Sequence, residues 1–393
     1  MKYNFDKQID RRGTNSVKWD EFHDSDIIPL WVADMDFETA PCIMNALKTR
    51  MEHACFGYTL VPDSFYKATI DWFVRRHGWK ISSKQAFIYT SGVVPAISAI
   101  IKAMTQPGDK VLIQSPVYNC FFSSIRNNGC EIVENVLLQG EKVGIDWEAF
   151  ERQCSDPKVK VFLMCNPHNP VGRVWTKAEL LRMGDICMKN RVLVISDEIH
   201  CEFVYSKEKP YTPFASLSEE FAQHCAVCIS PSKAFNIAGL QIANIIAENG
   251  DVRGKIDKAI NINEVCDVNP FGVIALQAAY SKEGEEWLDE LCEYIHGNFQ
   301  LAKDMIGKGL PELKVAELEG TYLMWVDVKA LGLTAKELSE RLLKDGKVYV
   351  NPGTMYGEKT GEGYIRINLA TRRSLVQEGI GRLIRVCCQL LGR

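Results

Sequence analysis

The chain has 393 residues, of which 46% are hydrophobic and 24% are charged, and its formal net charge is -4 at pH 7. A chain of this length suits one large domain with a smaller companion, because single domains usually contain about 100 to 200 residues. The weakly acidic balance, without a basic block carrying interleaved aromatic residues, excludes an extended nucleic-acid surface and favours a small-molecule ligand.

The cysteines and the N-terminal sequence indicate the compartment. The 14 cysteines are scattered rather than spaced as a disulfide framework, and MKYNFDKQIDRRG has no apolar stretch that could act as a signal. No uninterrupted apolar run approaches the roughly 18 residues of a membrane span. We therefore expect a cytoplasmic protein with reduced thiols and no membrane partner.

The first elements of the chain predict its organisation. Residues 1–41 are rich in loop-forming residues and end in WVADMDF, so we expect a segment without its own core that packs on the smaller domain or on a partner subunit. From residue 87 to 248, the apolar runs VLIQS, VKVFLMCN, VLVISDE, CAVCIS and ANIIAE alternate with helical stretches. This alternation predicts an α/β domain with a largely parallel sheet, over residues 42–284.

The C-terminal part has a different pattern. A long helical stretch, EEWLDELCEYIHGNFQLAKDMI, precedes the strand-like LMWVDV and YIRINLA and a final helix that extends through Leu391. Residues 285–393 are therefore predicted to form a smaller α+β domain. Ligands of a parallel sheet bind at the carboxyl ends of its strands, and the strands of the larger domain run into polar residues there: Ser115, Asn166, Asp197 and Ser230.

The sequence SPSKAFNIAGL places Lys233 next to the small hydroxyl residues Ser230 and Ser232, just beyond an apolar strand. A lysine whose pKa is lowered by its surroundings can attack an aldehyde and hold it as a Schiff base. Pyridoxal 5'-phosphate is bound in this way, and the hydroxyls of Ser230 and Ser232 suit its phosphate. The alternative is a surface lysine in a turn.

Asp197 ends the apolar strand VLVIS, where a carboxylate needs a partner to offset its lost hydration. The protonated pyridine nitrogen of the same cofactor is such a partner, and keeping it charged makes the ring an electron sink. A helix N-cap or a structural ion pair is the alternative.

A phosphate can be bound at the turn formed by Ser91, Gly92 and Val93, between FIYT and a helical run beginning near Pro95. Free backbone amides and the helix dipole favour an anion there. The alternative is the start of an ordinary capped helix that binds no ligand, since its sequence would look the same.

Three further residues are candidates for contacts with cofactor and substrate. Asn169, in NPHNPVGRVW, can donate to the ring oxygen of the cofactor. Tyr118, in SPVYNCF, can stack on the pyridine face, although an aromatic residue at a strand end also suits a core. Arg366, in YIRINLA, can bind a substrate carboxylate bidentately, against the alternative of a surface arginine.

No metal site is expected. Cys225 and Cys228 form a CxxC, but they lie in a strand, where residues three apart face opposite sides of the sheet. His200 and its acidic neighbours in DEIHCE follow a strand where the chain turns away.

The chain resembles the fold-type I pyridoxal-phosphate enzymes over essentially its whole length. The ordered motifs DRRGTNSVKWD, WVADMDF, NPHNPVGRVW, SDEIHCE and SPSKAFNIAGL are similar to the bacterial cystathionine β-lyase branch of the class I and II aminotransferase family. The resemblance implies an α/β/α large domain with a mostly parallel seven-stranded sheet and a smaller α+β C-terminal domain.

The resemblance also implies roles for the candidate residues. Lys233 would be the Schiff-base lysine, Asp197 the pyridine partner, and Arg366 the carboxylate clamp. Asn169 would donate to the ring oxygen, and Tyr118 would stack on the ring. Tyr58, in FGYT, matches a tyrosine that in the family reaches the phosphate of the neighbouring subunit, so the resemblance implies a homodimer with shared active sites.

Two positions depart from the general aminotransferase pattern. Aminotransferases usually carry a tyrosine three residues after the aspartate, where this chain has His200, as in the lyase branch. Many also carry a phosphate-binding arginine eight residues after the lysine, where this chain has Gln241. Phosphate binding would therefore depend more on Ser230, Ser232 and the amides near Gly92.

The resemblance leaves three functions open. A carbon–sulfur β-lyase acting on cystathionine, cysteine or related S-conjugates would release a thiol, pyruvate and ammonia. An aminotransferase would share the step in which the lysine removes the Cα proton of an amino acid. A regulatory protein on the same fold would tolerate a decayed site, whereas Lys233, Asp197, Asn169 and Arg366 are all present.

Overall fold

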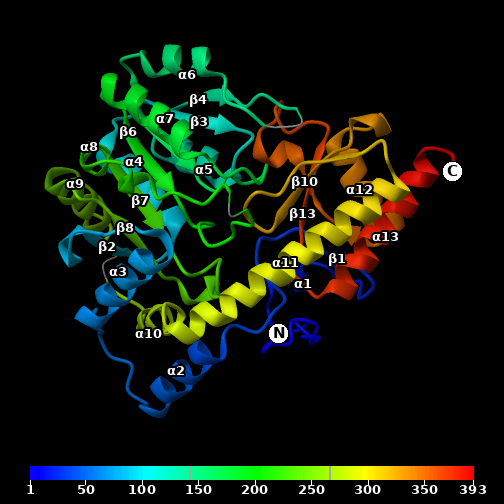
Figure 1. Cartoon of the computed structure of the whole chain (residues 1–393), viewed down its shortest axis with the longest axis horizontal. Helices are drawn as coiled ribbons and strands as arrows, with labels where there is room; N and C mark the ends of the chain where they lie inside the picture. The colour runs from blue at the N-terminus through cyan, green and yellow to red at the C-terminus, as the bar shows by residue number, and fades with distance from the viewer. Residues whose placement is uncertain (141–142, 207, 265–266) are drawn as a thin grey trace.

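A computed structural model describes residues 1–140, 143–206, 208–264 and 267–393 (Figure 1). The predicted α/β fold is confirmed: seven strands form one sheet in the order β2-β8-β7-β6-β5-β3-β4. The strands are β2 (Phe87–Thr90), β3 (Lys110–Ser115), β4 (Glu131–Val136), β5 (Val159–Cys165), β6 (Leu193–Asp197), β7 (Cys225–Ile229) and β8 (Ala243–Ile246). Pairs are parallel from β4 through β7, whereas β8 is antiparallel to both β7 and β2.

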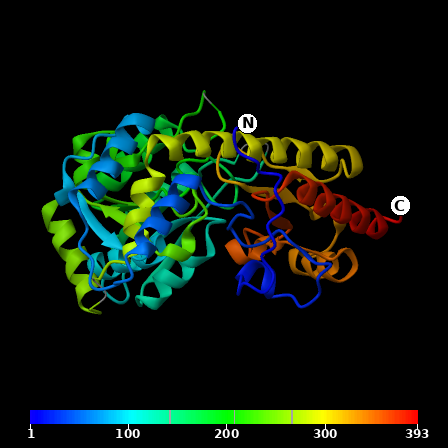
Figure 2. The ribbon, with the colours of Figure 1, turned by 90° about the horizontal axis from the view of Figure 1, so that it is seen from below.

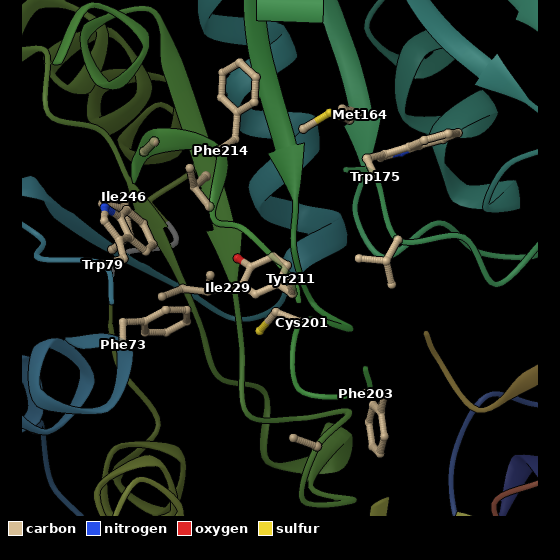
Figure 3. Packing of buried hydrophobic residues seen from close by; sticks show 14 of the residues in the cluster. Phe73, Trp79, Met164, Trp175, Cys201, Phe203, Tyr211, Phe214, Ile229 and Ile246 are labelled. Carbon is tan, nitrogen blue, oxygen red and sulfur yellow. The ribbon is translucent and has the colours of Figure 1, made fainter. Parts of the chain in front are cut away.

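Helices cover both faces of this sheet. Alternate residues of each strand point to opposite sides, and because apolar residues lie on both sides, both faces must be buried. In β5, Val161 and Leu163 pack in one hydrophobic cluster, and Phe162 and Met164 pack in another. Figure 3 shows part of the second cluster, including Met164. The first cluster includes α4 (Val93–Met104), α5 (Asn119–Asn127) and α9 (Gly250–Asn261). The second includes α2 (Pro41–Glu52), α3 (Asp63–His77), α6 (Trp147–Cys154), α7 (Lys177–Lys189), α8 (Glu219–Gln223) and α10 (Pro270–Ala279).

The start of α4 differs slightly from the sequence prediction. The helix begins at Val93 rather than near Pro95, because a proline in the first turn gives up only an N–H that has no partner within the helix. Its N-cap residue, Gly92, makes no side-chain cap. The first backbone N–H groups of α4 are therefore free to bind an anion.

A second core lies in the C-terminal part of the chain. The antiparallel sheet β12-β13-β10-β9 packs with α12 (Ala335–Gly346) and α13 (Arg373–Leu390). Its strands are β9 (Lys314–Val315), β10 (Leu323–Asp327), β12 (Asn351–Pro352) and β13 (Tyr364–Asn368). The long helix α11 (Lys282–Gly309) runs along both parts of the molecule (Figure 2). Its first half packs in the core of the large sheet through Leu291, and its second half packs in the second core through Phe299.

The predicted division into residues 42–284 and 285–393 stays a prediction, and it falls within the first turn of α11. The N-terminal segment contains α1 (Val17–Asp20) and β1 (Ile28–Pro29), and β1 pairs with β11 (Val348–Tyr349). Within the residues that the structure describes, no helix has the length and apolar character to cross a membrane.

Candidate active site

A cavity of about 420 Å³ lies where the N-terminal segment, the carboxyl ends of the large sheet and the C-terminal sheet meet. Most of the candidates named from the sequence line it together. These are Ser91, Gly92, Val93, Tyr118, Asn169, Asp197, His200, Ser232, Lys233 and Arg366. The carboxyl-end rule for parallel sheets brings residues far apart in the sequence to one site.

Lys233 follows β7, and its amino group donates to the carbonyl oxygen of Ala33 across 2.6 Å. The pKa of Lys233 is lowered to about 8, first by burial and then by the neighbouring Arg366, while Asp34 and Asp197 act in the opposite direction. A neutral amine is both a nucleophile and a base, so the site makes this lysine available for chemistry near neutral pH.

Asp197 is the last residue of β6, and its side chain is buried. Burial raises the pKa of its carboxyl to about 7, although the backbone N–H of Ile199 donates to it across 3.1 Å and lowers the pKa. The carboxylate thus lacks a partner strong enough to hold it fully charged. A cationic group of a ligand would be stabilised against it.

One end of the cavity suits an anion. The uncapped N-terminus of α4 supplies free backbone amides at Val93 and Val94, and the Ser232 hydroxyl faces the same cavity. Ser230 does not line the cavity: its hydroxyl accepts from the backbone N–H of Ser232 at 3.0 Å and donates to the carbonyl of Ile242. Ser230 therefore positions Ser232 through this hydrogen bond without facing the cavity itself.

The opposite end contains Arg366, which is buried on β13. Its guanidinium donates to Oδ1 of Asn169 at 3.2 Å and to the carbonyl of Trp31 at 2.8 Å. It also lies over the ring of Tyr356, 4.6 Å from the ring centroid. The Nε atom of Arg366 is buried and has no partner in the described chain, so the guanidinium keeps capacity for a carboxylate.

His200 and Tyr118 complete the set of predicted residues in the cavity. Burial lowers the pKa of His200 well below its usual value, with further contributions from Lys233 and Arg366, so its ring is neutral. Its Nδ1 is buried and has no hydrogen-bond partner among the described residues, and its ring lies edge-on to Tyr322 at a centroid distance of 5.5 Å. Burial raises the pKa of Tyr118, which therefore keeps its hydroxyl proton.

Tyr58 is not brought into the cavity of its own chain. Its side chain is 96% exposed, and it lies between α2 and α3 with the exposed apolar side chains of Phe56 and Leu60. Such a run of exposed apolar residues is typical of an interaction surface.

Sequence reasoning missed a group of residues that line the cavity. These are Trp31, Val32, Ala33, Val94, Pro95, Asn119, Cys165, Ile199, Ala238, Ile242, Asn351, Met355 and Tyr356. Several contribute backbone atoms, for which no side-chain signal exists. The proximity of WVADMDF to the lysine motif has no local signature either, because about 200 residues separate them.

A second polar cluster lies outside the residues that line the cavity. His77, Cys201 and Glu202 place one potential ligand atom each within 4.8 Å of one another. Glu202 accepts from Trp72 at 2.7 Å, from Arg76 at 2.8 Å and pairs with His77 at 2.8 Å. Because the carboxylate already has three partners, one of them a guanidinium, the cluster acts as a structural ion-pair network.

Comparison with known proteins gives consistent relatives over the full chain. The family described as aminotransferase class I and II matches residues 25–383. Cystathionine beta-lyase PatB of Bacillus subtilis is 43% identical over 385 residues, which cover 97% of this chain and 98% of that protein.

Two solved structures have the same fold over their whole length. Cystalysin from Treponema denticola, which contains a pyridoxal 5'-phosphate cofactor, aligns with a TM-score of 0.95 and 35% identity, covering 99% of this chain and 100% of that chain. The PLP-bound C-S lyase from Staphylococcus hominis aligns with a TM-score of 0.91 and 32% identity, covering 98% of this chain and 99% of that chain.

Proposed function

The chain belongs to the aminotransferase class I and II family, and we propose that it is a pyridoxal-phosphate-dependent carbon–sulfur β-lyase. Its substrates are cystathionine, cysteine or related S-conjugates, which it cleaves to a thiol, pyruvate and ammonia. One observation carries the proposal: Lys233, Asp197 and Arg366 face one cavity in a chain that is 43% identical over its length to a cystathionine β-lyase.

The cavity fits the cofactor. Asp197, whose pKa is raised by burial, would pair with the protonated pyridine nitrogen. The free amides at the start of α4, together with Ser91 and Ser232, would bind the phosphate. Asn169 would donate to the ring oxygen, and Lys233 would hold the cofactor covalently through Nζ.

Tyr118 would stack on the ring, and His200 would lie at the position where other family members carry a tyrosine. When bound, the cofactor supplies an electron-withdrawing ring that stabilises the negative charge left on Cα after proton removal.

The residues of this chain then perform three tasks. Arg366 binds the substrate carboxylate and orients the Cα–H bond toward Lys233. Lys233, freed by the incoming amino acid, takes the Cα proton on Nζ, which its lowered pKa allows near neutral pH. The C–S bond then breaks, the sulfur leaves as a thiolate, and water converts the three-carbon remainder to pyruvate and ammonia.

We further propose a homodimer in which Tyr58 of one subunit reaches the phosphate of the other. The exposed side chains of Phe56, Tyr58 and Leu60 support this arrangement, because burying them between subunits would remove apolar surface from water. We also propose a cytoplasmic location, where thiols stay reduced; the described cysteines are all free.

Product analysis tests the function. The purified enzyme should release pyruvate from L-cystathionine in amounts that exceed the enzyme concentration, without a keto acid being added as amino acceptor. An aminotransferase would instead stop after one half-reaction until a keto acid is added. Purified protein that transaminates amino acids and releases no pyruvate from any of these thioethers would refute the lyase assignment.

A further inference from the structure

The backbone of Trp31 to Asp34, here called the anchoring segment, contacts both Lys233 and Arg366. The carbonyl of Ala33 accepts from Lys233 at 2.6 Å and from the Tyr322 hydroxyl at 2.9 Å. The carbonyl of Trp31 accepts from Arg366 at 2.8 Å. The base and the carboxylate clamp therefore take their positions from one four-residue segment.

Ion pairs hold the C-terminal end of the anchoring segment in place. They join a cluster of four charged side chains: Arg11, Lys18, Asp34 and Asp36. Arg11 donates to Asp34 at 2.7 Å and to Asp36 at 2.8 Å. Lys18, whose side chain is 0% exposed, donates to Asp36 at 2.8 Å and lies 3.8 Å from Asp34. Arg11 also donates to the carbonyl of Met35 at 2.9 Å, so the cluster fixes backbone as well as side chains.

The burial of this cluster needs an explanation beyond stability. Burial alone would raise the pKa of Asp36, but Lys18 and then Trp19 and Arg11 bring it below its usual value. Well-packed apolar residues of similar volume would stabilise a fold about as well as a buried ion pair, because ions lose their hydration on burial. What directional charge pairs add is a defined geometry.

We propose that Arg11, Lys18, Asp34 and Asp36 are positioning residues that set the place of Lys233 and Arg366 through the carbonyls of Ala33 and Trp31. The inference rests on the proposed function only in taking Lys233 as the group that removes the Cα proton. When the Lys233 amine is not bonded to the cofactor, it donates a hydrogen bond to the Ala33 carbonyl, which keeps the amine near Cα of the substrate.

The cluster also acts on Lys233 electrostatically. The charged and titratable groups that face the amine are Arg366 from β13, Asp34 from the anchoring segment, Asp197 from β6 and Cys120 from α5, and His200 also interacts with it. Of these, Asp34 is paired with Arg11. Neutralising Asp34 should lower the pKa of Lys233, and removing Arg11 should raise it.

The test measures exchange of the Cα proton of L-alanine in D2O by the holoenzyme, followed by proton NMR across pD. L-alanine has no leaving group on Cβ, so the exchange reports only the step in which the C–H bond breaks and a C–D bond forms. Wild-type protein that exchanges this proton but releases no pyruvate from L-cystathionine would refute the lyase proposal and leave this test intact.

Two variants should move the pD profile in opposite directions. In Asp34→Asn the rising limb should shift to lower pD, and in Arg11→Met it should shift to higher pD, each by at least about 0.3 units. The maximal exchange rate should fall about tenfold in both. Arg12→Met is the matched control, because within the described residues Arg12 donates to carbonyls between Trp19 and Ile27 and not to Asp34 or Asp36. The rising limb of its pD profile should not move.

The proposal is overturned if the rising limb of both variants stays at the wild-type pD and their exchange rates fall only as much as their melting temperatures do. The cluster would then only stabilise the fold. If the neutral variants do not fold, Arg11→Lys decides the matter. The lysine keeps the positive charge but cannot donate to Asp34 and Asp36 with a planar fork. The rising limb of the pD profile should therefore stay in place while the maximal exchange rate falls severalfold. An unchanged maximal rate in folded Arg11→Lys would contradict the positioning role.

Discussion

Arg366 donates from Nη1 to Oδ1 of Asn169 across 3.2 Å, which joins the C-terminal sheet to the loop after β5. Because Oδ1 of Asn169 is used as an acceptor, its Nδ2 group is the part of the amide that can donate. The proposed carboxylate clamp and the proposed donor to the ring oxygen therefore orient each other. This link was not part of the sequence prediction, which placed each residue separately.

Replacing Arg366 by lysine should weaken substrate binding more than it slows the chemistry. Arg366→Lys keeps the charge but loses the planar fork, so we expect the KM for L-cystathionine to rise about 10- to 100-fold and kcat to fall much less. Steady-state kinetics of pyruvate release measures both. Arg385→Lys, on the exposed face of α13, is the control. An unchanged KM in Arg366→Lys would exclude the clamp.

Asp197 should give the cofactor-free protein a distinct pH dependence of stability. Folding raises its pKa from 3.8 to about 7, so the native state binds a proton that the unfolded state has already lost. The free energy of unfolding should therefore fall as pH rises from about 4 to about 7, and the loss should remain above that range.

Urea unfolding of wild type and Asp197→Asn at several pH values measures this effect. The decline should be smaller in Asp197→Asn, while Glu198, whose pKa burial also raises to about 7, contributes to both proteins. Added cofactor should restore stability at pH 8 in wild type far more than in the variant. Parallel pH profiles of the two proteins would contradict the role of Asp197.

The sequence located most of the candidate residues that line the cavity, because each follows an apolar strand or belongs to a motif. The ends of β5, β6 and β7 carry Asn169, Asp197 and Lys233 within a few residues, and parallel strands bring such ends together. The reversed direction of β8 had no signal, since fully buried strands read as continuous apolar runs in either direction.

The backbone contribution of the anchoring segment had no sequence signal either. Carbonyl groups are common to all residues, and the contact of Ala33 with Lys233 arises only from tertiary packing. The location of Tyr58 away from its own cavity follows from the family resemblance and not from any pattern in the residues around it.

Mixing two inactive variants tests the shared site. In the proposed homodimer, Tyr58→Ala and Lys233→Ala would each damage every site of their own dimer, whereas a mixed dimer would have one site with both residues intact. After subunit exchange, an equal mixture should recover up to about a quarter of the wild-type rate, because half of the dimers are mixed. A mixture that is no more active than the sum of its parts would contradict the sharing of Tyr58 between subunits.

Gln241 offers a gain-of-affinity test at the phosphate end. It lines the cavity with a left-handed backbone (φ 54) and donates to the carbonyl of Ala238 at 3.0 Å. Gln241→Arg would add a cation to the wall of the cavity, so the dissociation constant of the cofactor should fall about tenfold if the phosphate is bound at this end. Gln241→Met adds no charge and is the control. Equal affinities in the two variants would place the phosphate elsewhere.

Pyruvate release from L-cystathionine by Lys233→Ala shows most directly whether Lys233 drives repeated cleavage of a C–S bond. Wild type and the exposed-lysine control Lys255→Ala should release many equivalents of pyruvate per subunit, and Lys233→Ala should be slower by at least about a thousandfold. Normal turnover in Lys233→Ala would contradict the account. Conversion of wild type to a stable pyridoxamine form without pyruvate would contradict it equally and would indicate transamination.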